Sequence, residues 1–308
     1  MIVTILDLGT NTFNALIVDI NDNQYNIIYY KKFNIKLGEH TIDQGIISEA
    51  AFQRGLNALV ELKALSSEHN SERIIAIGTS ALRSSSNSCD FVKAVKEKTN
   101  INIQIIDGNT EAELISRGVK LALPEINQKY IIIDIGGGST EFIITHNNQI
   151  LWKKSYDLGV ARLLSKFKPS DPITKKEIDA VEKYLETELT DLFSKIKEFE
   201  VKLLVGSSGS FDTFAEMIIA REQEPIIIES IKGYDFNIKD YLKIHSLLIN
   251  SNKEERLKMK GLIEMRVDMI VLSTIFVNLF LKKANIQEMK LSTYSLKEGI
   301  VYNILNNL

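Results

Sequence analysis

The sequence carries one short pattern twice, each time at the end of an apolar segment. Asp7-Leu-Gly-Thr-Asn-Thr ends the first segment, and Asp134-Ile-Gly-Gly-Gly-Ser-Thr ends the second. A shift of 127 positions, 134 minus 7, superposes the two aspartates, Gly9 on Gly136, and the apolar residues that follow each loop. Such a repeat indicates an internal duplication, so the chain is expected to fold as two similar halves.

Apolar periodicity predicts alternating strands and helices on both sides of Pro124. The expected strands are 3–8, 14–20, 25–37, 73–78, 101–106, 130–135, 140–145, 150–156, 202–205 and 288–291. One helix is expected to begin near residue 48, and others are expected at 89–98, 110–122, 174–199 and 270–281. A final helix is expected from residue 296. This alternation predicts an α/β protein with mostly parallel sheets, divided into domains 1–124 and 125–308.

Composition fits an ordinary soluble protein, because 44% of the 308 residues are hydrophobic and 25% are charged. The single cysteine, Cys89, and four histidines without zinc-ligand spacing favour a reducing, cytoplasmic compartment. The longest apolar stretch, 270–281, is too short to span a bilayer, so no membrane partner is expected. A net charge of −3 argues against duplex nucleic acid and requires a local positive groove for any polyanion.

The loops after the two aspartates have the chemistry of a phosphate site. Glycine and small hydroxyl residues expose backbone N–H groups to a phosphate, and the neighbouring carboxylate can hold a divalent cation. A lone copy is more often a simple hairpin turn. Two related copies and a third glycine loop, 206–210, favour phosphate binding, and two facing domains would bring all three loops to one cleft.

Arg83 and Glu111 are candidate catalytic residues. Arg83 follows the strand 73–78, and its planar fork suits phosphate oxygens, although a surface salt bridge is the simpler interpretation. Glu111 begins a helix, where the helix dipole favours an acid in any case. A carboxylate in this place could instead activate water as a general base.

Four motifs together give the chain a family resemblance. They are Asp7-Leu-Gly-Thr-Asn-Thr-Phe-Asn, Thr79-Ser-Ala-Leu-Arg83, Gly108-Asn-Thr-Glu-Ala-Glu-Leu and Asp134-Ile-Gly-Gly-Gly-Ser-Thr-Glu141. With them the chain resembles the exopolyphosphatase and guanosine pentaphosphate phosphatase (Ppx/GppA) family of the actin-like ATPase superfamily. The resemblance implies two duplicated actin-like (ribonuclease H-like) α/β domains with an active-site cleft between them.

The resemblance also implies a role for each matching residue. Glu111 would be the general base, and Arg83 would neutralise charge on the phosphate oxygens as a further catalytic residue. Asp134 and Glu141 would hold Mg²⁺, or Mn²⁺ in its place, and Asp7 is a further candidate ligand. The residues expected to bind phosphate are Gly9, Thr10, Asn11, Thr12, Ser80, Gly136, Gly137, Gly138, Ser139, Thr140, Gly206, Ser207, Ser208 and Gly209.

Two motifs depart from the family pattern. The third loop has Ser208 or Ser210 where a second glycine is usual, and residues 295–299 read Ser-Leu-Lys-Glu-Gly instead of Gly-Leu-Arg-Glu-Gly. The chain resembles the short two-domain form of the family, in which the helical domain of longer members is not expected. Shorter polyphosphates or a nucleotide are the substrates expected of this form.

Several functions stay open at the level of sequence. The favoured one is metal-dependent removal of the terminal phosphate of inorganic polyphosphate. Guanosine pentaphosphate 5′-phosphatase activity at the same site is the first alternative. An ATP-dependent kinase and a nucleotide-responsive binding module without turnover are more distant ones. The sequence does not fix the oligomeric state, and a homodimer is kept as an expectation.

A basic cluster follows the second aspartate loop. It comprises Lys153, Lys154, Arg162, Lys166 and Lys168. The cluster is either a solvated face or the positive lining of an exit for the phosphate chain.

Overall fold

The computed structural model describes residues 1–21, 24–39, 44–221 and 228–306. The chain forms two compact units, Met1–Gly118 with Leu296–Leu308 and Val119–Ser295. The sequence predicts a single division after residue 124, whereas the C-terminal segment groups with the first unit. The reason is that its helix, α13 (Leu296–Leu305), packs against the first strand of the chain, β1 (Ile2–Leu8).

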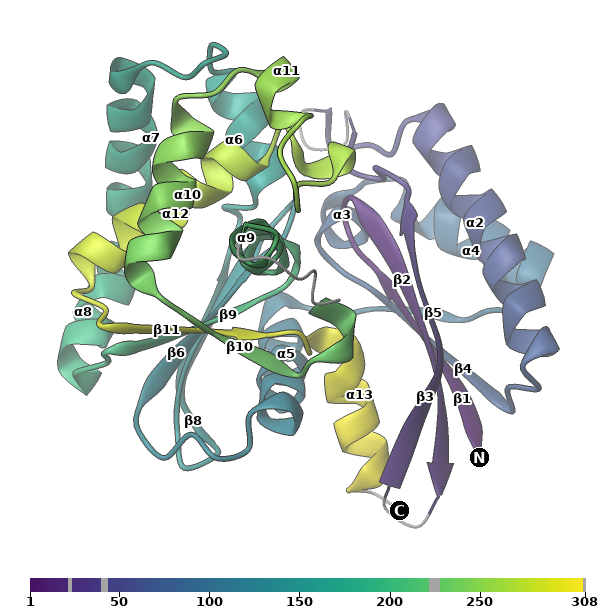
Figure 1. Ribbon diagram of the computed structural model, residues 1–308. Helices are drawn as coiled ribbons and strands as arrows, with labels where there is room; N and C mark the ends of the chain where they lie inside the picture. Colours follow the sequence, from purple (N-terminus) through teal and green to yellow (C-terminus); the bar gives the residue numbers. More distant parts are fainter. Residues whose placement is uncertain (22–23, 40–43, 222–227, 307–308) are drawn as a thin grey trace. The chain divides into compact units, whose positions relative to one another are not determined.

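The first unit is built on a five-stranded sheet in the order β3-β2-β1-β4-β5 (Figure 1). Its other strands are β2 (Thr12–Asn21), β3 (Gln24–Asn34), β4 (Arg73–Gly78) and β5 (Ile103–Ile105). Strands β1, β4 and β5 run parallel, while β2 and β3 are antiparallel additions. The sheet is therefore mixed. Too few residues separate β1, β2 and β3 for the crossover connection that parallel neighbours need.

Apart from α3 (Ser80–Ser84), which was not predicted, the helices of the first unit follow the predicted periodicity. The unit contains α2 (Glu49–Glu68), α3, α4 (Ser88–Thr99) and α13, and α5 (Gly108–Ala122) begins in this unit. In Figure 1, α2 and α4 lie on one side of the sheet, and the edge-on rings of Phe52 and Phe91 join them. The core beneath them includes Leu6, Phe13 and Leu59, all buried.

The second unit has a six-stranded sheet in the order β10-β11-β9-β6-β7-β8. Its strands are β6 (Tyr130–Ile135), β7 (Thr140–His146), β8 (Gln149–Tyr156), β9 (Leu203–Ser207), β10 (Gly233–Phe236) and β11 (Glu288–Ser292). Its helices are α6 (Val160–Phe167), α7 (Lys175–Glu188), α8 (Thr190–Phe199), α9 (Gly209–Ile219), α10 (Ile238–Ile249), α11 (Lys253–Arg256) and α12 (Ile270–Lys283). Short 3₁₀ turns cover Ile228–Ser230 and Glu264–Arg266.

One predicted helix is two helices. The apolar stripe predicts a continuous helix over 174–199, and its predicted capping box of Thr174 and Glu177 is present. The helix is interrupted at Leu189, whose φ of −102° and ψ of 16° lie outside helical geometry. Leu189 is fully buried, so α7 and α8 keep the same apolar stripe on the core although they are separate.

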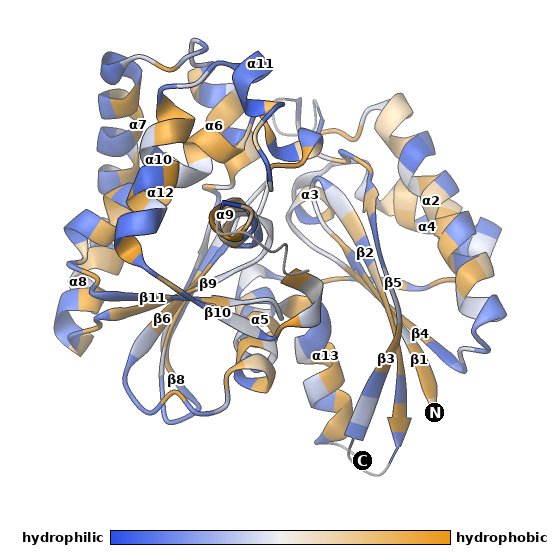
Figure 2. Cartoon of the chain, in the orientation of Figure 1, coloured by the Kyte–Doolittle hydropathy of each residue, from blue (hydrophilic) through white to orange (hydrophobic). Residues whose placement is uncertain are grey.

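Hydropathy separates surface helices from the buried one. In Figure 2, α2 and α7 carry both blue and orange residues, as amphipathic helices do. Helix α12 is different, since every residue from Ile270 to Leu281 is buried in the core of the second unit. Among the residues that the structure describes, no helix combines the length and the apolar character that crossing a bilayer requires.

The two sheets repeat one hairpin in detail. Asp7 pairs with Asn14 across β1 and β2, and Asp134 pairs with Glu141 across β6 and β7. Both pairs obey the shift of 127 residues, and so do the irregularities in register after residues 17 and 144. The predicted fold class, two duplicated actin-like α/β units, is confirmed.

Candidate active site

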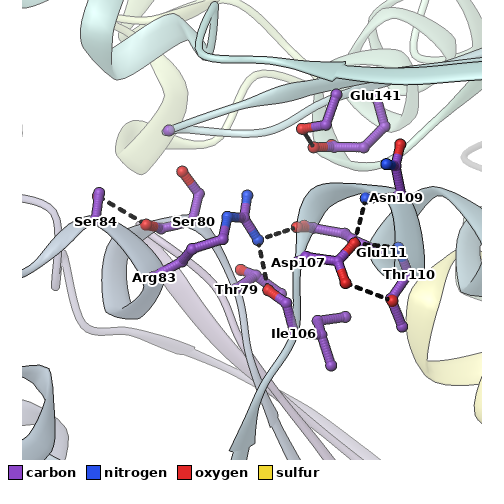
Figure 3. Close-up of polar contacts among 12 residues, drawn as sticks. Thr79, Ser80, Arg83, Ser84, Ile106, Asp107, Asn109, Thr110, Glu111 and Glu141 are labelled. Carbon is purple, nitrogen blue, oxygen red and sulfur yellow. Dashed lines mark hydrogen bonds and ion pairs between the residues drawn. The ribbon is translucent and has the colours of Figure 1, made fainter.

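The N-terminus of α5 brings Glu111 and Arg83 together. Arg83 Nη1 donates hydrogen bonds of 2.9 Å to both Glu111 Oε2 and the carbonyl oxygen of Ile106 (Figure 3). Glu111 is only 8% exposed. The salt bridge considered for Arg83 therefore exists, but its partner is the predicted base. The pair is a buried acid held by a cation, which is typical of a catalytic carboxylate.

Asp107 fixes the start of α5 and was not singled out from the sequence. Its carboxylate accepts hydrogen bonds from the backbone N–H groups of Asn109 and Thr110, at 2.8 and 2.9 Å, and from the Thr110 hydroxyl at 3.0 Å. These bonds, chiefly those from Thr110, lower the pKa of Asp107. An aspartate just before a helical Gly-Asn-Thr is a capping signal that could have identified it.

Helix α3 holds Arg83 near the end of β4. Thr79 precedes the helix, its hydroxyl donates to the Leu8 carbonyl oxygen at 3.4 Å, and its own carbonyl accepts from the Arg83 N–H at 2.9 Å. Ser80, a predicted phosphate ligand, is buried at the start of α3. Through Thr79, Arg83 is therefore held near the end of β1, where the first aspartate loop begins.

The first aspartate loop is a closed turn of residues 9–12. The Gly9 N–H donates to the Thr12 carbonyl oxygen at 3.0 Å, and Asn14 Nδ2 donates to Asp7 Oδ2 at 2.9 Å. The carbonyl oxygens of Thr10 and Asn11 accept hydrogen bonds from backbone N–H groups of the segment 35–38. The four predicted phosphate-binding residues of this loop are therefore held by backbone contacts on both sides.

The second aspartate loop has the same closure, with the Gly136 N–H donating to the Ser139 carbonyl oxygen at 3.0 Å. A further layer of contacts comes from α6, whose first N–H groups donate to the carbonyl oxygens of Gly136 and Gly137. Arg162 Nε donates to the Gly138 carbonyl oxygen at 2.6 Å. These contacts fix the glycine loop in one conformation.

Gly159 makes the approach of α6 to the loop possible. A Cβ at this position would lie 2.3 Å from the Gly137 carbonyl carbon and 2.4 Å from the Gly138 nitrogen. No side chain fits at that distance. Gly159 was not among the site residues expected from the sequence, and its close packing on the loop is seen only in the structure.

Asp134 and Glu141 lie opposite one another on adjacent antiparallel strands, so their side chains share one face of the sheet. They are 6% and 1% exposed. Asp134 Oδ2 accepts a hydrogen bond of 2.6 Å from Ser295, and Glu141 Oε1 accepts one of 2.7 Å from Ser155. Two buried carboxylates on one face are a fitting donor set for a hard divalent cation.

Burial raises the pKa of Asp134 above its ordinary value. Hydrogen bonds from Ser295, Ser207 and Ser208 oppose this effect, and the charge of Asp212 adds to it. A bound cation would favour the ionised form again. Over the described residues, no group of three or more histidine, cysteine or acidic side chains is arranged to hold a metal. Mg²⁺ commonly takes one or two carboxylates and completes its shell with water and phosphate oxygens.

The third glycine loop connects β9 to α9 and lies beside Asp134, because Ser207 pairs with Asp134 across the parallel strands β9 and β6. A Cβ on Gly206 would lie 2.0 Å from Phe211. Ser208 has φ 73° and ψ 174°, a region of backbone conformation that is essentially reserved for glycine. The departure from the family pattern is therefore at Ser208, whereas Ser210 has entered the helix.

Arg266 belongs to the 3₁₀ turn Glu264–Arg266, and its positively charged side chain contacts the first turn of α9. Its Nη1 donates hydrogen bonds to the Gly209 carbonyl oxygen and the Thr213 hydroxyl. Arg266 was not among the site residues expected from the sequence. Within the second unit, the structure thus gathers Asp134, Glu141 and both glycine loops.

The basic cluster is partly neutralised within the second unit. Lys154 pairs with Asp191 at 2.6 Å, and Arg162 pairs with Asp157 at 3.4 Å. Lys166 Nζ lies 4.5 Å from the centre of the Tyr184 ring. The exit for the phosphate chain stays a prediction, in which Lys166 and Lys168 are the members to test.

Fold and site together define a class of protein. Each unit presents a strand, an aspartate, a glycine turn and a second strand, a hairpin whose backbone N–H groups can bind an anion. The first unit adds a buried acid paired with an arginine. The arrangement suits phosphoryl chemistry with water as the acceptor.

Comparisons with known proteins agree with this class. The profile of the Ppx/GppA phosphatase family matches residues 16–308. A Haemophilus influenzae protein, provisionally named exopolyphosphatase, is 27% identical over 303 residues, which span 98% of this chain and 91% of the relative. The chain belongs to the Ppx/GppA phosphatase family.

Two crystal structures extend the comparison. An exopolyphosphatase from Cytophaga hutchinsonii is 37% identical, with a TM-score of 0.97 over 100% of this chain and 99% of that chain. A family member from Aquifex aeolicus is 23% identical, with a TM-score of 0.83 over 100% and 98% of the two chains, and shows the same fold. The predicted enzyme class, a phosphatase and so a hydrolase, is confirmed with the family.

Proposed function

We propose that this protein is an exopolyphosphatase. In the proposed reaction, water attacks the terminal phosphorus of inorganic polyphosphate, the anhydride bond to the next phosphate breaks, and orthophosphate leaves with a chain that is one phosphate shorter. The exopolyphosphatase from Cytophaga hutchinsonii supports this substrate, since the two chains match over their whole length. The observation that carries the proposal is the buried Glu111 held 2.9 Å from Arg83.

Glu111 is proposed to accept the proton of the attacking water. The carboxylate is held in place by Arg83, and Asp107 caps the helix that carries it, so its orientation does not depend on the substrate. Arg83 keeps further N–H donors beyond those of Nη1 and can offer them to phosphate oxygens. One side chain would then orient the base and neutralise charge on the transferred group.

The glycine loops and acidic residues of the second unit are proposed to bind phosphate and metal. Backbone N–H groups of the segments 137–140 and 206–209 would donate to phosphate oxygens, as would Ser80 and the segment 10–12 of the first unit. Gly9 and Gly136 would shape their loops, because their own N–H groups close the turns. Asp134 and Glu141 would hold Mg²⁺ or Mn²⁺. When bound, the cation would neutralise charge on the phosphate oxygens. The cleft expected from the sequence stays a prediction.

Phosphate release provides the test. Purified protein is assayed on polyphosphates of defined length and on guanosine pentaphosphate, each with Mg²⁺ and after exhaustive chelation. The proposal predicts orthophosphate from polyphosphate only when the cation is present. Faster release from guanosine pentaphosphate would favour the nucleotide phosphatase, the second activity in the family name. Full activity after chelation would contradict the role of the metal.

Two finer expectations from the sequence belong to the same proposal. The single, exposed cysteine suits a reducing compartment such as the cytoplasm. The homodimer is tested by light scattering across a range of protein concentrations, and a monomeric mass throughout would contradict it.

A further inference from the structure

A buried arginine holds the segment 257–269, which connects α11 to α12 (Figure 1). Arg256, the last residue of α11, is only 4% exposed. Its guanidinium donates to the carbonyl oxygens of Ser251 at 2.5 Å and Val267 at 3.0 Å. It also lies 2.8 Å from Asp171 Oδ1. The planar guanidinium has its donors in a fixed geometry, so Arg256 holds these three partners in fixed positions relative to one another.

Asp171 attaches this arginine to the connection between α6 and α7. One carboxylate oxygen pairs with Arg256, and the other accepts a hydrogen bond of 2.6 Å from the backbone N–H of Lys253. Lys253 is the first residue of α11 and Arg256 is the last. Both ends of this short helix are therefore attached to one carboxylate, so the guanidinium has a fixed position from which to hold Val267.

The connecting segment packs against α9 at two points. At the first, a Cβ on Gly261 would lie 2.5 Å from the Glu216 carbonyl oxygen, and the φ of 80° also favours glycine. At the second, Arg266 donates to the Gly209 carbonyl oxygen and the Thr213 hydroxyl. The segment therefore follows α9 from its C-terminal part back to its first turn.

The second contact supports the strained part of the third glycine loop. A Cβ on Gly209 would lie 2.1 Å from Arg266 Nη2, so the guanidinium fits only because residue 209 has no side chain. Ser208, just before it, has the glycine-like φ of 73°, and Ser207 lies opposite Asp134 across β9 and β6. Strained backbone persists only where neighbouring contacts hold it. The position of Arg266 therefore affects the conformation of the loop beside Asp134.

We propose that Arg256 is a positioning residue for the third glycine loop and acts on it through Arg266. A long arginine side chain loses rotational entropy when it is held in one place. Arg256 limits this freedom by holding the carbonyl group of Val267, the residue next to Arg266. The guanidinium of Arg266 then meets Gly209 in one position. The inference rests on the proposed function, in which the segment 206–209 donates to phosphate oxygens.

Amide hydrogen exchange tests the support of the loop without any substrate. Peptides that cover residues 206–213 are followed by mass spectrometry in the wild type, Arg256→Met and Lys253→Met. Arg256→Met should make exchange in these peptides about fivefold faster or more, because local opening becomes easier. Lys253→Met is the matched control and should exchange like the wild type, because its ion pair with Asp268 is exposed. Wild-type exchange in Arg256→Met would overturn the proposal.

A double-mutant cycle tests whether Arg256 acts through Arg266. The measured quantity is kcat/KM for phosphate release from polyphosphate by the wild type, Arg256→Met, Arg266→Met and the variant with both changes. Arg256→Met alone should lower kcat/KM about tenfold or more, because the loop is displaced. In the Arg266→Met background the same change should cost less than about twofold, because the side chain that Arg256 positions is gone. Equal losses in both backgrounds would indicate a purely structural role and overturn the proposal.

Arg256→Lys takes the place of Arg256→Met if the methionine variant does not fold. Lysine keeps the charge beside Asp171 but lacks the planar fork that serves Ser251 and Val267 together. The same two comparisons then decide, and wild-type exchange over residues 206–213 again overturns the proposal. If the wild type releases no phosphate from polyphosphate, the proposed function fails, whereas the exchange measurement still tests the role of Arg256.

Discussion

Arg83 Nη1 lies 2.9 Å from Glu111 Oε2, and the two residues are 28 positions apart in the chain. One guanidinium nitrogen also holds the carbonyl oxygen of Ile106, at the end of β5, so the base is tied to the sheet as well as to its helix. This hydrogen bond joins Arg83 and Glu111, which the sequence offered only as two separate catalytic candidates. It also determines the substitutions that are most informative.

Glu111→Gln should reduce phosphate release from polyphosphate by about a hundredfold or more, because the amide cannot accept the proton of the attacking water. Glutamine keeps the size of the side chain but removes the charge that pairs with Arg83, so turnover is measured at a temperature where the variant is shown to be folded. Glu113→Gln, two residues along α5, is the matched control and should retain activity. Near-normal turnover in Glu111→Gln would mean that another group is the base.

Gly159→Ala should abolish most phosphate release although it changes no charged or hydroxyl group. Its Cβ would lie 2.3 Å from the Gly137 carbonyl group, so α6 or the glycine loop must move. Displacements near 1 Å in a catalytic arrangement can cost about a hundredfold in rate. Turnover and substrate affinity measured on the folded variant provide the test, and wild-type values for both would show that the loop tolerates the shift.

Glycine should be more stable than alanine at position 208, and alanine more stable than glycine at position 210. At Ser208, alanine keeps a Cβ in a backbone region that suits glycine, so Ser208→Gly should be more stable than Ser208→Ala by about 1 kcal/mol. At Ser210, inside α9, alanine should be better than glycine by about 1 kcal/mol. Denaturant unfolding of the four variants measures both differences, and the same order at the two sites would contradict the strain at Ser208.

Stability should fall below neutral pH because of His245. Burial, followed by the charge of Lys282, lowers the pKa of His245 to about 4, against 6.5 for the free side chain. The unfolded state therefore binds a proton first, so the stabilisation is complete above about pH 6.5 and is lost as the pH falls toward 4. Its ring Nδ1 lies 3.1 Å from the Thr274 hydroxyl.

His245→Gln should flatten the stability profile between pH 6.5 and pH 4, because glutamine does not titrate. The measurement is the free energy of unfolding at several pH values in chelator. His69→Gln, in the first unit, is the control histidine. A profile that keeps its full slope in His245→Gln would assign the pH dependence to other groups.

Lys166→Glu combined with Lys168→Glu should weaken binding of long polyphosphates and barely affect the shortest ones. The loss should shrink with salt, since exposed charges are screened within about 10 Å at 0.1 M. The control is Lys195→Glu with Lys197→Glu on α8. An equal loss for all chain lengths, or none, would mean that the chain leaves by another route.

The sequence by itself determined the features that depend on near neighbours. Strands, amphipathic helices, the capping box of Thr174 and Glu177, and the closed turns after Asp7 and Asp134 follow from local periodicity and local hydrogen bonds. The shift of 127 residues also predicted the duplicated fold, because equal patterns fold into equal hairpins. Arg83 and Glu111 could be selected in the same way, but only as separate candidates.

The tertiary structure decided which distant residues meet. The sequence pattern does not show that Arg83 binds Glu111, that Gly159 packs on Gly137, or that the strain of the third loop is at Ser208. It also does not show that α13 returns to pack against β1. These contacts depend on how the helices and strands are connected and packed. The residue types near each position do not determine that packing.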